Sequence, residues 1–250
     1  MEDEPSFRIC PIRRGFDHDK LTHNGRVPML YGKIIVMDNS VGRLRSLFPS
    51  CQLDMIVGSL LGDASLECRS NGKRGSITAR FRAHHGDKQK EYIFWKYSIL
   101  QDLTSREPRK IVWENPKRSL REVSWYFHTK SLEELGVFYE LFYPNKKKIL
   151  PENVFQLLTP RSLAIWFMDD GTHTGAGMII NSHSFSKKEQ EKIRHFFESR
   201  YGIITDIVKD REKWKIIIKN KNKDTFIHII KPFLIPTMKY KIVYPRNDSL

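Results

Sequence analysis

Two acidic residues, Asp63 and Asp170, each stand where an apolar helical segment stops. The first segment ends Leu60-Leu61-Gly62-Asp63-Ala64, and the second ends Phe167-Met168-Asp169-Asp170-Gly171. The C-terminal end of a helix carries a partial negative charge, so a carboxylate there is unfavourable and a second carboxylate nearby adds repulsion. A hard divalent cation with oxygen ligands offsets both effects, and Mg²⁺ commonly binds through one or two carboxylates. Metal held between two such acids can activate a water and stabilise the leaving oxygen of a phosphodiester.

The alternative is structural, because Asp-Gly after a helix is an ordinary turn and one apolar helix ending in Asp is more often structural than catalytic. Two such endings, separated by a duplicated set of elements in a strongly basic chain, favour function. Gly58 and Gly62 fall on one face of the first helix, which predicts that the two helices approach closely, backbone against backbone. Asp63 and Asp170 would then meet at the shared end of the pair.

The elements that position these acids follow the same order in both halves of the chain. Each half is predicted to contain a helix, a strand or hairpin, a helix, two strands and a final helix. Three helix starts carry capping signals, which are Ser131 with Glu134, Thr159 followed by Pro160, and Ser186 with Glu189. Such a duplication predicts two similar α+β units related by a pseudo-twofold axis, at residues 51–150 and 151–250. Residues 1–50 are expected to form an N-terminal extension of unassigned role.

The net charge is +14, because 43 Lys and Arg residues face 29 Asp and Glu residues. This surplus suits a polyanionic partner, either nucleic acid or an anionic membrane surface, although a merely basic or ribosome-associated protein would also carry it. No apolar run approaches the roughly 20 residues needed to span a bilayer. The acidic start, Met1-Glu2-Asp3-Glu4, has no apolar core behind it. We therefore expect no membrane partner and an intracellular location, cytoplasmic or organellar, without secretion.

The stretches Leu53–Ala64 and Leu163–Gly171 resemble the two signature helices of LAGLIDADG homing endonucleases, and Thr159–Gly171 is the most specific stretch. The resemblance covers roughly Leu53 to Val243 and is strongest to the monomeric, two-motif enzymes encoded in group I introns. The first motif departs from the name-giving pattern at Gly62-Asp63-Ala64 but keeps the acid. The resemblance implies two αββαββα-type units with antiparallel saddle sheets, joined by the packed helices. It also implies a monomer that uses Mg²⁺ or Mn²⁺ to make double-strand breaks, with short 3′ overhangs, at a long asymmetric site in double-stranded DNA.

The resemblance assigns roles to individual residues. The last acid of each motif, Asp63 and Asp170, is the expected metal ligand. Gly62 and Asp169, directly before these acids, are expected at the same metal site, with Asp169 as a bystander or supporting group. One basic residue per half is expected at the active site, matching Lys147 and Lys241, and the register within Lys146–Lys148 stays open. A polar residue that orders active-site waters matches His85 and His183, where the family more often has an amide. For either histidine, a plain loop residue is the alternative.

Two strand faces are expected to read DNA. Thr78, Arg80 and Arg82 share one face, and Lys213, Lys215 and Lys219 share another. Such side chains can bond base edges in the major groove, while Lys73, Arg74 and Lys221 are expected to neutralise phosphates. A polar strand face in water would have the same pattern.

Two other functions fit the same resemblance. One is an RNA maturase that binds intron RNA and assists group I intron splicing, and the other is a non-cleaving DNA-binding protein on the same scaffold. Maturase activity would not require both acids, so the presence of Asp63 and Asp170 with their lysines favours cleavage. No appended helix-turn-helix segment supports the DNA-binding regulator.

Overall fold

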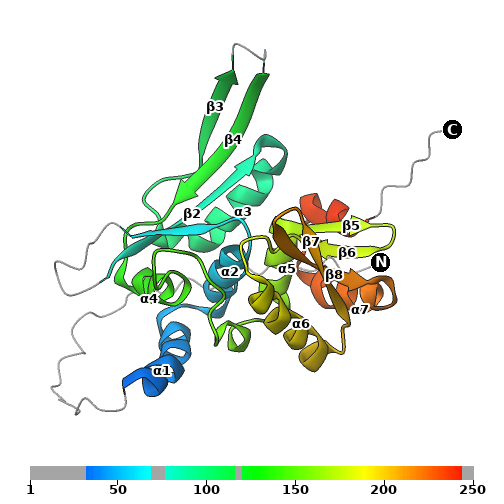
Figure 1. Cartoon of the computed structure of the whole chain (residues 1–250). Coiled ribbons are helices and arrows are strands. Elements are labelled where there is room, and N and C mark those ends of the chain that lie inside the picture. Colours follow the sequence, from blue (N-terminus) through cyan, green and yellow to red (C-terminus); the bar gives the residue numbers. More distant parts are fainter. Residues whose placement is uncertain (1–31, 69–76, 116–119, 244–250) are drawn as a thin grey trace, which may run out of the picture.

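A pair of packed helices forms the centre of the molecule. The structure is a computed structural model that describes residues 32–68, 77–115 and 120–243. The central helices are α2 (Ser50–Leu61) and α5 (Pro160–Asp170), and one four-stranded antiparallel sheet lies on each side of them (Figure 1). The predicted α+β fold of two similar units is therefore confirmed.

The first unit holds a sheet in the order β1-β2-β4-β3. Its strands are β1 (Ser65–Cys68), β2 (Ala79–Gly86), β3 (Arg109–Asn115) and β4 (Leu120–His128). Helices α3 (Lys90–Leu100) and α4 (Glu133–Phe142) pack against this sheet. The β3–β4 hairpin extends well beyond the rest of the unit (Figure 1).

The second unit repeats this arrangement with the sheet order β5-β6-β8-β7. Its strands are β5 (Gly171–Thr174), β6 (Gly177–Ile180), β7 (Thr205–Asp210) and β8 (Lys213–Lys219). Helices α6 (Lys187–Tyr201) and α7 (Asn220–Ile230) pack against this sheet, and a 3₁₀ helix, η6 (Pro236–Ile242), returns to β5.

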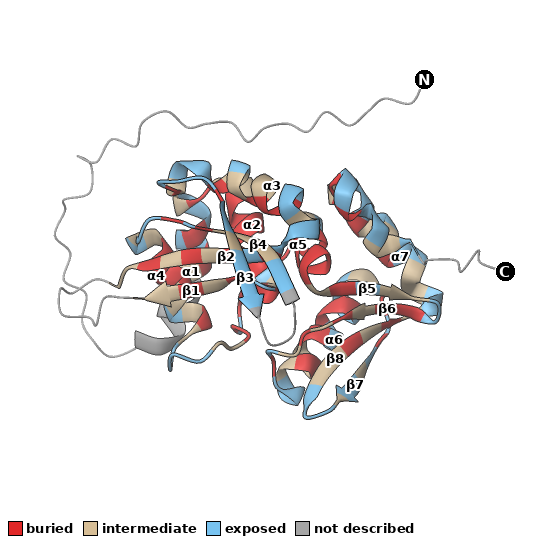
Figure 2. Cartoon of the chain, turned by 90° about the horizontal axis from the view of Figure 1, so that it is seen from above, coloured by how far each residue is buried: buried red, intermediate tan, exposed pale blue. Residues whose placement is uncertain are grey.

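Each sheet buries one face under helices and leaves the other open. Along β2, Ala79, Phe81 and Ala83 are buried, whereas Arg80 and Arg82 between them are partly exposed. Helices α3 and α4 contact the buried side of this strand. Figure 2 shows the same alternation along the sheets and shows α2 and α5 as mostly buried. The two-residue period of the sequence thus determines which side chains point into the core.

Two of the three predicted helix caps are confirmed. Thr159 caps α5 and Ser186 caps α6, each through a reciprocal pair of hydrogen bonds with the third residue of its helix. The cap predicted at Ser131 is wrong, because α4 starts one residue later with Leu132 at its N-cap. Leu132 exchanges two backbone hydrogen bonds with Ala79, so strand pairing extends to that residue and delays the helix.

Part of the expected N-terminal extension is helical. Helix α1 (Gly32–Leu47) packs against α4 and α2. Leu44 and Phe48 are buried, and the ring of Phe48 lies 5.6 Å from that of Phe138. This segment therefore adds to the core of the first unit. None of the helices in the described part of the chain has the length and apolar character that a membrane span requires.

Candidate active site

Glycine permits the close approach of the two central helices. A Cβ atom added to Gly58 would lie 2.5 Å from the carbonyl oxygen of Ser162 and 2.8 Å from Cβ of Ile165. Real side chains do not come so close, so the backbones of α2 and α5 touch at this position as predicted. Asp63 follows α2 directly after its C-cap, and Asp170 is the last residue of α5. The packing therefore brings the two acids to one end of the pair.

The electrostatics of this end favour a bound cation. Burial raises the pKa of Asp170 to about 8, and the carboxylates of Asp63 and Asp169 add to that rise. Desolvation and the neighbouring Asp169 also raise the pKa of Asp63, whose side chain is still 46% exposed. The neighbouring lysines Lys148 and Lys241 only partly oppose these shifts. An oxygen-binding divalent cation would relieve the repulsion, so Asp63 and Asp170 fit the metal that the sequence led us to expect.

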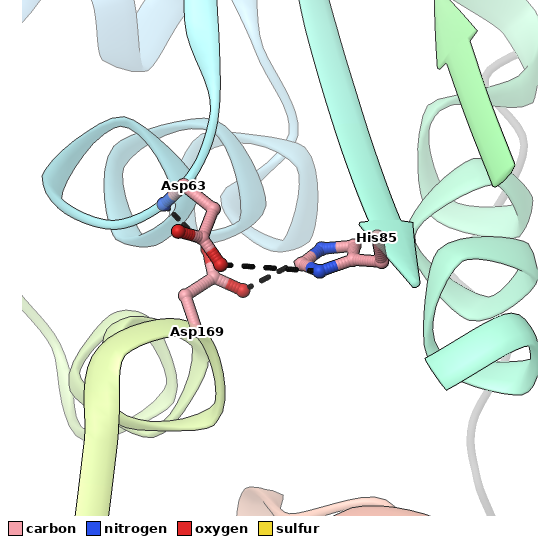
Figure 3. Close-up of side chains that lie close together, drawn as sticks. All are labelled: Asp63, His85 and Asp169. Atoms are coloured by element: carbon pink, nitrogen blue, oxygen red, sulfur yellow. Dashed lines mark hydrogen bonds and ion pairs between the residues drawn. The ribbon is translucent and has the colours of Figure 1, made fainter. Parts of the chain in front are cut away.

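His85 completes a cluster with Asp63 and Asp169, in which the imidazole faces both carboxylates (Figure 3). Its Nδ1 lies 3.9 Å from Oδ2 of Asp63, and its Nε2 lies 3.8 Å from Oδ1 of Asp169. One possible ligand atom from each residue falls within 4.8 Å of the others. His85 belongs to the buried side of β2 and comes to the helix ends because that strand stops there.

The imidazole of His85 is neutral and has a free nitrogen. Burial lowers the pKa of His85 to about 3, with the charge of Lys96 as the next cause. Nδ1 lies 3.1 Å from Oε1 of Gln89, so we assign its proton to that hydrogen bond. Among the described residues, none hydrogen-bonds to the buried Nε2. That nitrogen is thus an acceptor directed toward the acids, suited to orienting a water.

Asp169 is held from the opposite side. Both of its carboxylate oxygens accept hydrogen bonds from Nζ of Lys96, at 2.7 and 2.9 Å, and Oδ1 also accepts from the hydroxyl of Tyr92 at 2.8 Å. The side chains of Asp169 and Lys96 are both fully buried. The ammonium of Lys96 already binds both oxygens of this carboxylate. The arrangement therefore suits the supporting role expected for Asp169 better than direct metal ligation.

A lysine lies at each helix end. Nζ of Lys148 donates to the carbonyl oxygen of Gly62 at 3.1 Å, and Nζ of Lys241 donates to the carbonyl oxygen of Asp169 at 2.8 Å. Burial lowers the pKa of Lys148 to about 8 and also lowers that of Lys241, while the neighbouring carboxylates oppose both shifts. Lys147, the expected partner of Lys241, is exposed. The structure therefore brings Lys148, and not Lys147, to the acids.

The strand register distinguishes the two expected histidines. Ser65, two positions after Asp63, pairs with Arg82 in the first unit. Thr172, two positions after Asp170, pairs with Ile179 in the second unit. His85 lies three residues after Arg82, and the residue three positions after Ile179 is Ser182. The counterpart of His85 is therefore Ser182, and His183 lies one residue too far along.

His183 is engaged elsewhere. Its Nε2 lies 3.3 Å from Oδ2 of Asp210 on β7. The hydroxyl of Ser182 is buried and donates to Oε1 of Gln190 at 2.7 Å. The structure thus brings one of the two predicted histidines to the acids, and the two halves of the site are unequal.

The predicted DNA-contacting residues that the structure describes lie mostly on the open sheet faces. Arg80 and Arg82 flank Glu67, which accepts hydrogen bonds from both at 2.8 and 3.1 Å. Thr78 lies just before β2, where it contacts the hydroxyl of Ser131. Lys73 and Arg74 lie outside the described residues.

The second sheet carries its lysines on β8. Lys213 is exposed, and Lys215 and Lys219 pair with Asp210 and Asp206 of β7 at 2.9 and 3.1 Å. Lys221 lies in the first turn of α7 and is exposed, so it is not on the sheet. Acids accompany the basic side chains on both faces, which holds them in defined positions.

Lys96 and Tyr92 were missed by the sequence analysis. Helical spacing places both on the buried face of α3, together with Ile93 and Leu100. Lysine is almost never fully buried unless it is paired. A lysine in the core register of an apolar helix was therefore a signal for an internal acid partner.

Known proteins resemble this chain across both of its units. The sequence profile of the LAGLIDADG DNA endonuclease family matches residues 53–226. The DNA endonuclease I-ChuI of Chlamydomonas applanata is 33% identical over 210 residues, which are 76% of this chain and 94% of that protein. The cytochrome b mRNA maturase bI2 of Debaryomyces hansenii is 27% identical over 215 residues, covering 84% of this chain and 80% of the relative.

A solved structure supports the fold. The homing endonuclease I-WcaI bound to its DNA recognition sequence superposes with a TM-score of 0.71 at 22% identity, covering 82% of this chain and 93% of the other. At that identity the likeness concerns the arrangement of elements. The profile match includes most of α2, all of α5 and all the strands of both sheets. The chain therefore belongs to the LAGLIDADG DNA endonuclease family.

Proposed function

We propose that this chain is a site-specific homing endonuclease that makes metal-dependent double-strand breaks at a long asymmetric site in double-stranded DNA. The observation that carries the proposal is the meeting of Asp63 and Asp170 at one end of α2 and α5, with a partly buried lysine at each helix end. Membership of the DNA endonuclease family supports the same reaction.

The metal is proposed to be Mg²⁺ or Mn²⁺ held by Asp63 and Asp170. When bound, such a cation stabilises charge on phosphodiester oxygens and makes a bound water easier to deprotonate. Lys148 and Lys241 add fixed positive charge beside the reacting phosphates, where negative charge develops. Nε2 of His85 accepts a hydrogen bond from a water and orients it toward the scissile bond. Because its imidazole is neutral, His85 does not repel the metal cation electrostatically.

DNA is proposed to lie across the open faces of the two sheets. The first face offers arginines with Glu67 between them, and the second offers lysines beside Asp206 and Asp210. Arginine bonds guanine edges bidentately, whereas lysine is a point charge on a flexible stem. Faces that differ in this way suit an asymmetric site read by one monomer.

A cleavage selection tests this proposal. The purified chain is incubated with a plasmid library carrying host genomic or randomised inserts, once with Mg²⁺ and once with EDTA. Recovery of one long sequence cut in both strands only with Mg²⁺ supports the endonuclease. Absence of metal-dependent cutting under conditions where the chain is folded contradicts it.

Intron RNA folding is a second candidate function, favoured by the similarity to the maturase bI2 over 84% of the chain. Filter binding to the chain's own intron RNA, with a scrambled RNA of equal length as control, tests it directly. Tight, specific RNA binding without DNA cleavage would favour the maturase. Binding together with cleavage would show both activities in one chain.

A further inference from the structure

Lys96 forms a buried ion pair with Asp169 across the two units. Its side chain is 0% exposed, and it extends from α3 to the end of α5. Nζ lies 2.7 and 2.9 Å from the two oxygens of Asp169, and the ring of Tyr92 lies 4.6 Å below the ammonium. Removing one member of a buried ion pair leaves the other charge buried without a partner, whereas replacing both members is often tolerated.

Asp169 is a carboxylate in a position where a cation could bind. With Asp63 and His85 it supplies two carboxylates and an imidazole whose ligand atoms lie within 4.8 Å of one another. Such a mixed oxygen and nitrogen set is attractive to Mn²⁺ and to later transition metals. A metal at this position would bind off the Asp63–Asp170 axis, on one half of the site only.

Asp169 also touches the end of the opposite helix. Its Oδ2 lies 3.4 Å from the backbone nitrogen of Asp63, and a Cβ atom on Gly62 would lie 2.7 Å from that oxygen. Its own carbonyl oxygen accepts from Lys241, and Asp170 follows it directly. A shift of Asp169 would therefore change the positions of Asp63, Asp170 and Lys241.

The two halves are unequal at this point. Asp169 precedes Asp170 as Gly62 precedes Asp63, so the residue opposite Asp169 has no side chain. No side chain could fit at position 62, because the side chain of Asp169 fills the space beside Gly62. The extra acid thus belongs to one helix alone, and Lys96 is the cation that matches it.

We propose that Lys96 is a positioning residue that acts as a fixed internal cation, holding Asp169 against the end of α2 and keeping divalent metal out of the Asp63–His85–Asp169 cluster. This inference rests on the proposed metal-dependent function. It assigns the metal to Asp63 and Asp170 and gives Asp169 the task of joining the two helix ends.

The test compares Lys96→Met, Asp169→Asn and the double variant Lys96→Met/Asp169→Asn with the unaltered chain. Lys90→Met is the matched control, since Lys90 lies on the same helix and is exposed. Mn²⁺ binding to the DNA-free proteins is measured by electron paramagnetic resonance. Thermal unfolding and single-turnover cleavage of the selected site are measured on the same samples.

We expect Lys96→Met to bind Mn²⁺ about tenfold more tightly than the unaltered chain, because the freed Asp169 joins Asp63 and His85 as a ligand. The double variant should lose this gain. Cleavage should fall by about tenfold to a hundredfold in Lys96→Met and return to within about threefold in the double variant. Lys90→Met should resemble the unaltered chain in every assay.

Unchanged Mn²⁺ affinity in Lys96→Met would overturn the proposal, and so would a double variant that cuts no faster than Lys96→Met. If Lys96→Met does not fold, the double variant, which contains no unpaired buried charge, decides the question through its cleavage rate. The metal-binding experiment does not require DNA cleavage. A chain that never cuts DNA would therefore refute the proposed function while the role of Lys96 is judged separately.

Discussion

Nζ of Lys241 donates a 2.8 Å hydrogen bond to the backbone carbonyl oxygen of Asp169, the residue that precedes Asp170. Lys148 makes the equivalent contact with Gly62, the residue that precedes Asp63. The two lysines come from segments that follow the last α-helix of each unit, so residues distant in sequence from the acids complete each half of the site. Removal of a single group from this arrangement should have separable effects on cutting and on binding.

Neutralising either central acid should abolish cutting. Asp63→Asn and Asp170→Asn should each lower the single-turnover cleavage rate by more than about a hundredfold, since even the outer partners of metal ligands are often worth that much. DNA binding in Ca²⁺ should change little, because an amide keeps the shape of the side chain. Asp102→Asn, at an exposed position, is the control. Near-normal cutting by either variant would remove that aspartate from the reaction.

The lysine run offers a matched pair of variants. Lys148→Met should lower the cleavage rate by about a hundredfold, as loss of one electrostatic stabiliser of developing charge typically does. Lys147→Met should leave the rate unchanged, because Lys147 is exposed. Single-turnover kinetics at saturating protein separate this effect from weaker DNA binding. The opposite ranking of the two variants would place Lys147 at the active site.

The histidines should also differ. His85→Ala should slow cleavage by about tenfold or more, because the water that its Nε2 orients loses its acceptor. His85→Gln should recover part of the rate, since an amide oxygen can accept the same hydrogen bond. His183→Ala should have little effect, because His183 pairs with Asp210. Equal losses in both alanine variants would argue against the unequal halves described above.

The stability of the metal-free chain should decrease as the pH rises toward 9. The pKa of Asp170 is raised to about 8 in the folded state, so its contribution is fully present below the ordinary value of 3.8 and is lost as the pH rises through about 8. Asp170→Asn should remove this part of the pH dependence. Mg²⁺ should restore stability at high pH in the unaltered chain and not in the variant. Thermal unfolding between pH 6 and 9, with EDTA or Mg²⁺, provides the measurement.

DNA affinity should depend steeply on salt. Each phosphate neutralised by a lysine or arginine contributes about −0.9 to the slope of log K against log salt concentration. Lys213→Ala should flatten the slope by about one if Lys213 contacts a phosphate. Arg82→Ala should relax the preference at one base pair if Arg82 contacts a base edge. Fluorescence anisotropy on the selected site and on single-base variants separates the two outcomes, and a salt-independent affinity would contradict DNA binding by the open faces.

Much of the site was determined by local sequence. The apolar segments ending at Asp63 and Asp170, the caps at Thr159 and Ser186, and the alternation along β2 are short-range patterns, and the structure contains all of them. Glycine at position 58 also predicted the close approach of α2 and α5, because only a residue without a side chain permits it. Helical and strand periods act over a few residues and therefore survive in any fold that buries the same faces.

Tertiary structure decided which neighbours complete the site. Lys148, and not the exposed Lys147, contacts the end of α2, and strand register makes Ser182 the counterpart of His85. The pairing of Lys96 with Asp169 joins residues that are 73 positions apart. Such contacts depend on how complete elements pack, and a shift of one residue exchanges one side chain for its neighbour. The sequence by itself determined where the acids stand, and only the packed structure determined which cations and which imidazole stand beside them.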